Sequence, residues 1–459
     1  MADLVTFHPE TPSQSITRRL QSGEKSRFSA PSLLNSTSNF PAQATKERIK
    51  RDGLPDRHKK SYEIAATGRL GKPYEIMQAD FRIKRLEKWE MLDNVKKVLP
   101  EHRTAGCMDR APGASGVSVH VHVDSHGQDV GAHYDSIFTC GCVWTCPVCS
   151  SKISRLRRGE LKTAIDFWSR LGGQVVMLTL TIPHHSGQKL HEVRDLFQDA
   201  RRRFRNRKAW KTWAQSCGFL GSVRALETTH GSNGWHVHTH ELMFLDNYSP
   251  EKVREYKSFL LKAWQSACES SGLGTPNDHG VDLQDAEKAA GYVSKFGAEF
   301  ELTSTHTKRG NLNGKTPWDL LRSGTSADAK LFREFAEVFH GSRQLVWSRG
   351  LRSLLNLSKE QSDEELSKQS EATETVDIIE VYVFDHQEWS LIKKTKSRGI
   401  VLEIARESGE RGILSFLKRL KNEKKKSKKE EIRKLENLSD SNCSRPPGKF
   451  NFSRSGRYL

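Results

Sequence analysis

The chain has 459 residues, of which 74 are Lys or Arg and 56 are Asp or Glu, so its formal net charge is +18. The length suits about three domains, and the absence of an apolar run of about 18 residues argues against a membrane span. Only 35% of the residues are apolar, below the roughly 45–50% of a globular domain, so part of the chain is expected to be disordered. The N-terminus lacks the apolar stretch of a secretory signal. We therefore expect a cytoplasmic protein whose basic charge binds a polyanion, with nucleic acid as the first candidate.

Composition and charge divide the chain into six predicted segments. These are a disordered arm over 1–60, a helical and zinc-binding segment over 61–150, an α/β region over 151–357, an acidic linker over 358–375, a small α/β unit over 376–420 and a basic tail over 421–459. In the small unit, the sequence predicts a strand over 378–384 and a helix over 400–420.

The region over 151–357 alternates between helical and strand periods. The predicted elements are a helix over 153–171, a strand over 175–182, a helix over 191–213, strands over 219–229 and 235–245 around the turn GSNG, a helix over 250–271 capped by Ser249, a strand over 280–283 and a helix over 285–296. After the first helix the order is β-α-β-β-α-β-α, which is typical of a ferredoxin-like α+β fold with an antiparallel sheet.

The strand WHVHTHELMF carries the residues that are most suited to a metal. Alternate side chains of a strand share a face, so His236, His238 and His240 are expected to lie together. If the GSNG turn closes the hairpin symmetrically, Glu227 lies directly opposite His238 on the same face. A mixed imidazole and carboxylate site suits Mg²⁺ or Mn²⁺, and also Zn²⁺ or Ni²⁺. The alternative is a strand whose histidines pack or face solvent.

The segment AAGYVSKFGAEF places a tyrosine and a lysine on one helical face. Tyr292 and Lys295 are three residues apart, which makes them neighbours on a helix. A tyrosine becomes a useful nucleophile when a nearby metal activates a phosphate and a cation lies beside it. By itself this short pattern is also typical of a core tyrosine with a solvated lysine.

Four cysteines lie in the ten residues of CGCVWTCPVC. Clustered CxxC spacing in an intracellular chain favours metal binding over disulfides. Cys146 and Cys149 supply half of a tetrahedral zinc site. The other half is open at this point, because Cys140 and Cys142 complete a compact set, although chelation by residues two apart is strained.

A basic stretch follows the first predicted strand. Its arginines and lysines are interleaved with Trp210 and Trp213, a pattern that suits phosphate contact and base stacking, although charge runs are often only solvated faces. The candidate DNA-binding residues are Arg201, Arg202, Arg203, Arg205, Arg207 and Lys208.

Three motifs in order resemble those of HUH endonucleases, and more closely those of the rolling-circle replication initiator (Rep) proteins of bacterial plasmids. They are VMLTLT, WHVHTHELMF and GYVSK. The cysteine segment CGCVWTCPVCSSKI and the downstream WSRGLRSLLNLSKEQSDEEL are also similar to that family, so the resemblance covers about 103–420. It implies a ferredoxin/RRM-like HUH domain and an enzyme that nicks one strand at an origin, forms a 5′-phosphotyrosyl link and later rejoins the strand.

Transferred to this sequence, the resemblance implies a role for each candidate residue. The family's histidine pair falls on His238 and His240, and His236 before it is an accessory ligand or a DNA contact; Glu227 stays the carboxylate that the hairpin geometry places beside them. Tyr292 is the implied nucleophile and Lys295 its cationic neighbour. Glu241 departs from the family pattern, which usually has an aliphatic residue there. With no second tyrosine nearby, the closing step needs water or another group, for which Glu287, Glu299 and Glu301 are the candidates.

The same resemblance favours Cys107, Cys140, Cys146 and Cys149 as the structural zinc ligands, with Cys142 as the alternative to Cys107. No Walker P-loop pattern occurs, so a helicase and a polymerase of the host are expected partners at the DNA origin. Two other functions remain open: an HUH transposase or relaxase with the same chemistry, and a zinc-containing DNA-binding regulator without catalysis.

Overall fold

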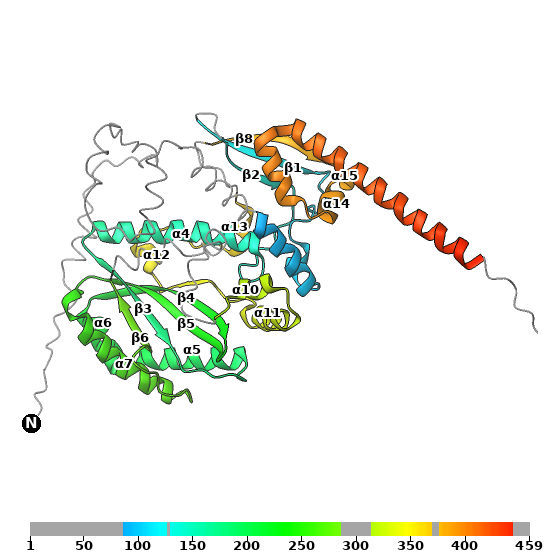
Figure 1. The fold of residues 1–459 in the computed structure, drawn as a ribbon. Helices are drawn as coiled ribbons and strands as arrows, with labels where there is room; N and C mark the ends of the chain where they lie inside the picture. The colour runs from blue at the N-terminus through cyan, green and yellow to red at the C-terminus, as the bar shows by residue number, and fades with distance from the viewer. Residues whose placement is uncertain (1–85, 126–128, 286–313, 370–375, 444–459) are drawn as a thin grey trace, which may run out of the picture. The chain divides into compact units, whose positions relative to one another are not determined.

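The computed structural model describes residues 86–125, 129–285, 314–369 and 376–443 (Figure 1). The chain divides into two compact units, Met1–Cys107 with Thr139–Gln369 and Met108–Phe138 with Ser370–Leu459. The predicted arm over 1–60, the predicted helix over 285–296 and the end of the predicted basic tail lie outside the described residues. Of the predicted helical stretch before the cysteines, residues 86–98 are described and are helical.

The first unit is built on an antiparallel sheet. Its strands lie in the order β6-β3-β5-β4-β7, and each neighbouring pair is antiparallel. The strands are β3 (Gln174–Thr181), β4 (Phe219–Gly231), β5 (Gly234–Leu245), β6 (Val281–Gln284) and β7 (Leu345–Trp347). The strands predicted over 175–182, 219–229, 235–245 and 280–283 are therefore confirmed, while β7 was not predicted.

The turn between β4 and β5 closes the hairpin in the predicted register, with Glu227 opposite His238. Gly234 begins β5 with φ +84° and a Cβ at this position would lie 2.9 Å from the carbonyl oxygen of His185. Both the left-handed backbone and the close approach require glycine. The turn chemistry therefore fixes which side chains of the two strands face each other.

Helices cover both faces of this sheet. They are η1 (Arg103–Gly106), α4 (Pro147–Arg170), α5 (Leu190–Asn206), α6 (Lys208–Ser216), η2 (Pro250–Lys252), α7 (Val253–Glu269), α10 (Pro317–Ser323), α11 (Ser326–Phe339), α12 (Leu351–Leu354) and α13 (Asp363–Lys368). The helix predicted over 191–213 is divided at Arg207, which has extended backbone between α5 and α6. Ser249 precedes η2 but makes no side-chain capping bond. Within the part of the chain that the structure describes, no helix is long and apolar enough to cross a membrane.

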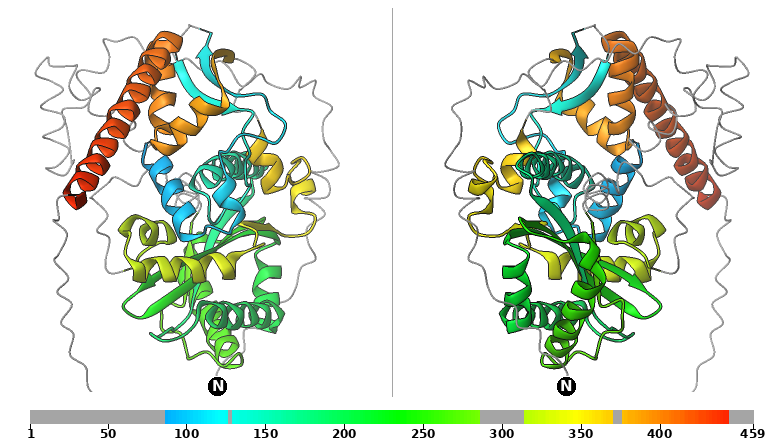
Figure 2. Two further views of the ribbon diagram at one scale, coloured as in Figure 1. Left: turned by 90° about the vertical axis from the view of Figure 1, so that its right-hand side faces the viewer. Right: turned by 90° about the vertical axis from the view of Figure 1, so that its left-hand side faces the viewer.

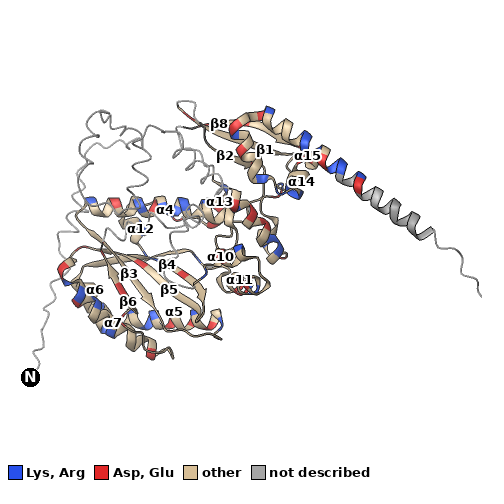
Figure 3. Cartoon of the chain, in the orientation of Figure 1, with Lys and Arg blue, Asp and Glu red and all other residues tan. Residues whose placement is uncertain are grey.

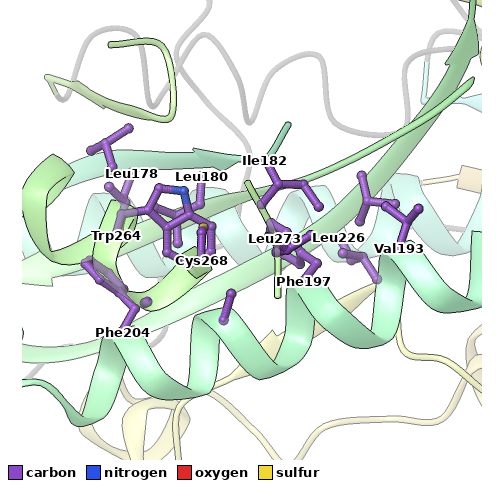
Figure 4. Packing of buried hydrophobic residues seen from close by; sticks show 14 of the residues in the cluster. Leu178, Leu180, Ile182, Val193, Phe197, Phe204, Leu226, Trp264, Cys268 and Leu273 are labelled. Carbon is purple, nitrogen blue, oxygen red and sulfur yellow. The ribbon is translucent and has the colours of Figure 1, made fainter. Parts of the chain in front are cut away.

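Two hydrophobic clusters separate the faces of the sheet. On one face, even-numbered residues of β3 such as Leu178 and Leu180 pack with Phe197 and Phe204 of α5 and Trp264 of α7 (Figure 4). On the other face, odd-numbered residues of β3 and even-numbered residues of β5 pack with α4 and α12. Fully burying an aromatic or aliphatic side chain contributes about 1.5–3 kcal/mol, so these two clusters hold the sheet between its helices.

The second unit is a three-stranded antiparallel sheet with helices on one face (Figures 1 and 2). The strands are β1 (Val117–Asp124), β2 (Asp129–Asp135) and β8 (Val376–Phe384), in the order β2-β1-β8. The helices are α14 (His386–Lys394) and α15 (Arg398–Cys443), and α15 changes direction at Gly409, where φ is 56°. The strand predicted over 378–384 is confirmed, and the helix predicted over 400–420 lies inside α15.

Buried side chains join the helices to this second sheet. Val117, Val119 and Trp389 are buried, and the hydroxyl of Tyr134 donates to the carbonyl oxygen of Arg398 at 2.7 Å. The opposite face of β1 carries Ser118, His120 and His122. Along β1, apolar side chains on the face covered by helices therefore alternate with polar side chains on the opposite face.

Candidate functional site

Strand β5 has different polar groups on its two faces. The even-numbered side chains of β5 lie on the α4 side of the sheet, because Leu242 and Phe244 pack there. His236, His238 and His240 are also even-numbered and lie on the same side. Val237 and Met243 place the odd-numbered side chains on the α5 side. The apolar part of the α4 face ends where the histidines begin, so the histidines lie on the sheet beyond the packed cluster.

Glu227, His238 and His240 form a compact group of candidate metal ligands. The Nε2 atoms of His238 and His240 lie 3.4 Å and 3.6 Å from Oε2 of Glu227. Two ligand atoms bonded to one ion at about 2.1 Å in a tetrahedron are about 3.4 Å apart. Each histidine nitrogen therefore lies at about the distance from the carboxylate oxygen that two ligands of one divalent ion have, and the group could hold a metal ion.

Thr179 orients one ligand of this group. It pairs with His240 across β3 and β5, and its Oγ1 lies 2.9 Å from Nδ1 of His240. The bond turns Nε2 of the same ring toward Glu227. Burial lowers the pKa of His240, although the carboxylates of Glu227 and Asp282 oppose the shift. Burial thus favours the neutral ring, which is the form that binds a metal.

Replacing Thr179 by Val is expected to weaken metal binding at this group by about 10–100-fold, because a hydrogen bond that orients a histidine ligand is lost while the side-chain shape is kept. Titration of the purified chain with Mn²⁺ by calorimetry measures this change. Thr181→Val is the matched control, because Thr181 faces the same way but its Oγ1 donates to the carbonyl oxygen of His279. Equal affinities for the two variants would contradict the orienting role of Thr179.

His236 lies beside the metal-ligand group and not within it. Its ring stacks on His238 at a centroid distance of 4.9 Å and on His184 at 4.9 Å. Burial, together with repulsion from His238 and His184, lowers the pKa of His236 to about 4. His184, in the loop after β3, and Asp282 on β6 were missed by sequence reasoning. The sequence signal for Asp282 was its position in the short strand predicted over 280–283. In the structure this strand pairs with β3, with Asp282 opposite Thr179.

A second group of candidate ligands consists of Cys107, Cys140, Cys146 and Cys149, all of them buried. Sγ of Cys149 lies 3.7 Å from Sγ of Cys107 and 3.7 Å from Sγ of Cys140, and Cys146 lies 3.5 Å from Cys107. Four thiolates bonded to zinc at about 2.3 Å are about 3.8 Å apart. The structure thus brings the distant Cys107 into the group and leaves Cys142 outside it.

The start of α4 holds this cysteine group together. Cys146 is the N-cap of α4, and its Sγ accepts from the backbone N–H of Cys149. Hydrogen bonds from the neighbouring thiols lower the pKa of Cys140, whereas burial raises the pKa of Cys146. In this buried cluster the thiolate form is favoured for Cys140 and disfavoured for Cys146. A bound cation would stabilise the thiolate forms of all the cysteines in the group.

The predicted basic surface divides into buried and exposed parts. Arg205 and Arg201 pair with Glu241, which is fully buried on the α5 face of β5. Burial disfavours the charged form of Glu241, but the charges of Arg205, Arg201 and Arg224 outweigh it and lower the pKa. Arg205 and Arg201 therefore have a structural partner inside the protein.

The other candidate basic residues lie at the end of α5 and the start of α6, two helices that carry several Lys and Arg residues (Figure 3). The side chains of Arg202 and Arg203 are 72% and 47% exposed and pair with Asp199. Arg207 donates to the carbonyl oxygen of Ser266 at 2.6 Å, and Lys208 begins α6. A shallow pocket is lined by Arg202, Arg203, Asn206, Arg207 and Ser270. Trp210 and Trp213 are buried, so the expectation that they stack on bases is wrong.

Replacing Arg205 by Ala is expected to destabilise the protein by about 3–5 kcal/mol, because the buried carboxylate of Glu241 loses its closest counter-charge. The free energy of unfolding, measured with urea, reports this loss. Arg202→Ala on the same helix is the control, with an expected change within about 1 kcal/mol. A similar small change for both variants would show that the buried pair contributes little.

Tyr292 and Lys295 lie outside the described residues, as do Glu287, Glu299 and Glu301. Their roles therefore rest on the sequence. The described residues that lead toward them belong to β6, which ends at Gln284 next to β3. Asp282 of β6 pairs with Thr179 in the register.

Comparison with known proteins gives three matches. Residues 137–401 match a family described as "Replication protein", which is more than half of the chain. The "Protein rep" of Streptomyces lividans is 26% identical over 294 residues, covering 48% of this chain and 64% of that protein. A "Neomycin resistance protein" of Streptomyces cyanogenus is 27% identical over 134 residues, covering 24% of this chain and 31% of that protein. The chain thus spans less than two thirds of the curated relatives that it matches, and no solved structure matches it.

Proposed function

Because the chain belongs to the replication protein family, we propose that it initiates plasmid rolling-circle replication by cutting one DNA strand at an origin. The observation that carries this proposal is the group of Glu227, His238 and His240, whose ligand atoms converge at 3.4 Å and 3.6 Å. Thr179 holds one of these rings in place. The strand order β6-β3-β5-β4 also supports a ferredoxin-like HUH fold, since it is the order of that plan with β7 added at one edge.

The proposed reaction is a transesterification. The hydroxyl oxygen of Tyr292 attacks the scissile phosphorus, the bond from phosphorus to the 3′ oxygen breaks, and the leaving oxygen takes up a proton. The strand is then joined through its 5′ phosphate to Tyr292 and has a free 3′-OH. Because one phosphodiester replaces another, the later rejoining step needs no nucleotide triphosphate.

The residues of the chain have separate tasks in this step. A divalent ion such as Mg²⁺ or Mn²⁺ bound by Glu227, His238 and His240 would polarise the scissile phosphate. Lys295 neutralises charge on the phosphate beside Tyr292. The exposed arginines at the end of α5, Arg202 and Arg203, contact the DNA backbone with salt-dependent affinity. The buried cysteine group holds a structural Zn²⁺. A host helicase unwinds the duplex and a host polymerase extends the free 3′ end.

The proposal is tested with labelled single-stranded origin DNA and the purified chain. In Mg²⁺ or Mn²⁺, a protein–DNA adduct that survives denaturation is expected, together with a shortened DNA strand. A chelator, or the double variant His238→Ala/His240→Ala, is expected to abolish the adduct while DNA binding in a gel-shift assay is kept. Binding without cleavage in every metal would instead identify a zinc-containing DNA-binding regulator.

A further inference from the structure

The second unit contains a cluster of histidines that has no part in the proposed reaction. On β1, His120 and His122 point to the face opposite α14 and α15, and on β2 His133 lies directly across from His120. Nε2 of His122 lies 2.6 Å from Nδ1 of His133. The ring centroids of His120 and His133 are 5.1 Å apart, and the two planes are nearly parallel at 23°.

A glycine of β2 lies beside His122, at a spacing that would also admit a Cβ. Gly131 lies opposite His122 in the register, and a Cβ on Gly131 would lie 3.5 Å from Nδ1 of His122. His122 itself is only 5% exposed. A buried imidazole needs polar partners, and a second imidazole is one of them here.

A carboxylate borders the cluster on the neighbouring strand. Glu380 of β8 pairs with His120, and its Oε2 lies 3.8 Å from Nε2 of His120. The side chain of Glu380 is 55% exposed, so an ion can approach the cluster from this side. Two alternating histidines on a central strand and a carboxylate on an adjacent strand also make up the group of Glu227, His238 and His240.

We propose that His122 and His133 form a second histidine metal site, which binds a borderline divalent ion such as Zn²⁺. Imidazole nitrogens favour Zn²⁺, Cu²⁺ and Ni²⁺ over Mg²⁺. His120 stacks on His133 and Glu380 lies beside His120, so a further ligand from either residue requires its side chain to move toward the pair. The inference is independent of the proposed nicking reaction, because all four residues belong to the other compact unit.

Metal binding takes the place of the hydrogen bond between the two histidines, and the proton of that bond moves to the other nitrogen of the same ring. In the metal-free pair, one neutral ring donates its N–H to the facing nitrogen of the other ring. When the ion enters, the donor ring carries its proton on the other nitrogen, so both facing nitrogens offer a lone pair and no proton is released. The two nitrogens then separate from 2.6 Å to about 3.3 Å, the spacing of two nitrogen ligands on tetrahedral zinc. The ion thereby links β1 to β2.

The test counts zinc on the full chain. Purified protein is stripped with a chelator, supplied with zinc chloride alone, freed of excess metal by gel filtration and analysed by elemental mass spectrometry. Wild type is expected to retain one zinc equivalent more than His122→Ala and one more than His133→Gln. His386→Ala removes an exposed histidine of the same unit outside the cluster and is expected to retain the wild-type amount.

Two further variants keep the outcome separate from the other sites. His240→Ala perturbs the Glu227 group, so the combined variant His240→Ala/His133→Gln is expected to lose the sum of the two single losses. His133→Gln also decides the test if His122→Ala does not fold, since glutamine still hydrogen-bonds to His122. Wild-type zinc content in folded His133→Gln, checked by circular dichroism, would overturn the proposal whether or not the chain nicks DNA.

Discussion

Tyr292→Phe is expected to abolish the covalent protein–DNA adduct and to lower strand cleavage by at least about 10⁴-fold, the scale on which an enzyme loses rate without its attacking group. Phenylalanine keeps the aromatic ring and removes only the oxygen that bonds to phosphorus. The free energy of unfolding and the affinity for single-stranded DNA are expected to stay unchanged. The adduct is measured on a denaturing gel with 5′- and 3′-labelled strands, which also identify the end that is joined to protein.

Tyr256→Phe is the matched control for this prediction. Tyr256 lies on α7, where its ring packs against Trp213 and Tyr248 on the α5 side of the sheet. The control is expected to cleave at the wild-type rate. An adduct that persists in Tyr292→Phe would assign the nucleophile to another residue, and peptide mapping of the adduct would then locate it.

Cys146→Ser is expected to remove one zinc equivalent and to lower the free energy of unfolding by about 4–5 kcal/mol or more, the range in which loss of a bound metal falls. Cys146 is both a member of the buried thiol group and the N-cap of α4. Serine can still cap the helix, so the loss isolates the metal ligand. For a unit of this size, the melting temperature should fall by about 10 °C or more.

Cys142→Ser tests whether this effect is specific. Cys142 lies in the same loop and its Sγ donates to the carbonyl oxygen of Cys140 at 3.5 Å, but Cys142 is not a member of the buried group of four cysteines. Its replacement is expected to leave the zinc content unchanged and to alter stability by less than about 1 kcal/mol. Zinc loss in Cys142→Ser with the wild-type zinc content in Cys107→Ser would mean that Cys142, and not Cys107, completes the group.

Local rules made part of the candidate site predictable. The alternation of a strand places His238 and His240 on one face, and the turn residues set Glu227 opposite His238, so neither inference needed the rest of the fold. The strands around them followed from β-branched runs bounded by Gly and Pro. For the cysteines, spacing identified Cys146 and Cys149, but the choice of Cys107 came from a family resemblance.

Long-range partners were not predictable from the pattern. Arg205 belongs to a run of arginines typical of a solvated or DNA-binding surface, but its buried partner Glu241 lies on β5, 36 residues further along the chain. Trp210 was expected to stack on bases, but tertiary packing places it against Phe204 and Arg205. The pairing of β1 with β8 joins segments from different parts of the chain, which no local signal reveals.

The buried ion pair of Glu241 with Arg201 and Arg205 has a consequence for sequence variation among relatives. An aliphatic residue at position 241 would remove the buried anion and leave two cations facing an apolar surface, whereas exchanging all three residues for apolar ones can be nearly neutral. The three positions are therefore expected to vary together. Relatives that carry Leu or Val at the position of Glu241 should lack the arginines that match Arg201 and Arg205, and those that keep the glutamate should keep at least the arginine of Arg205.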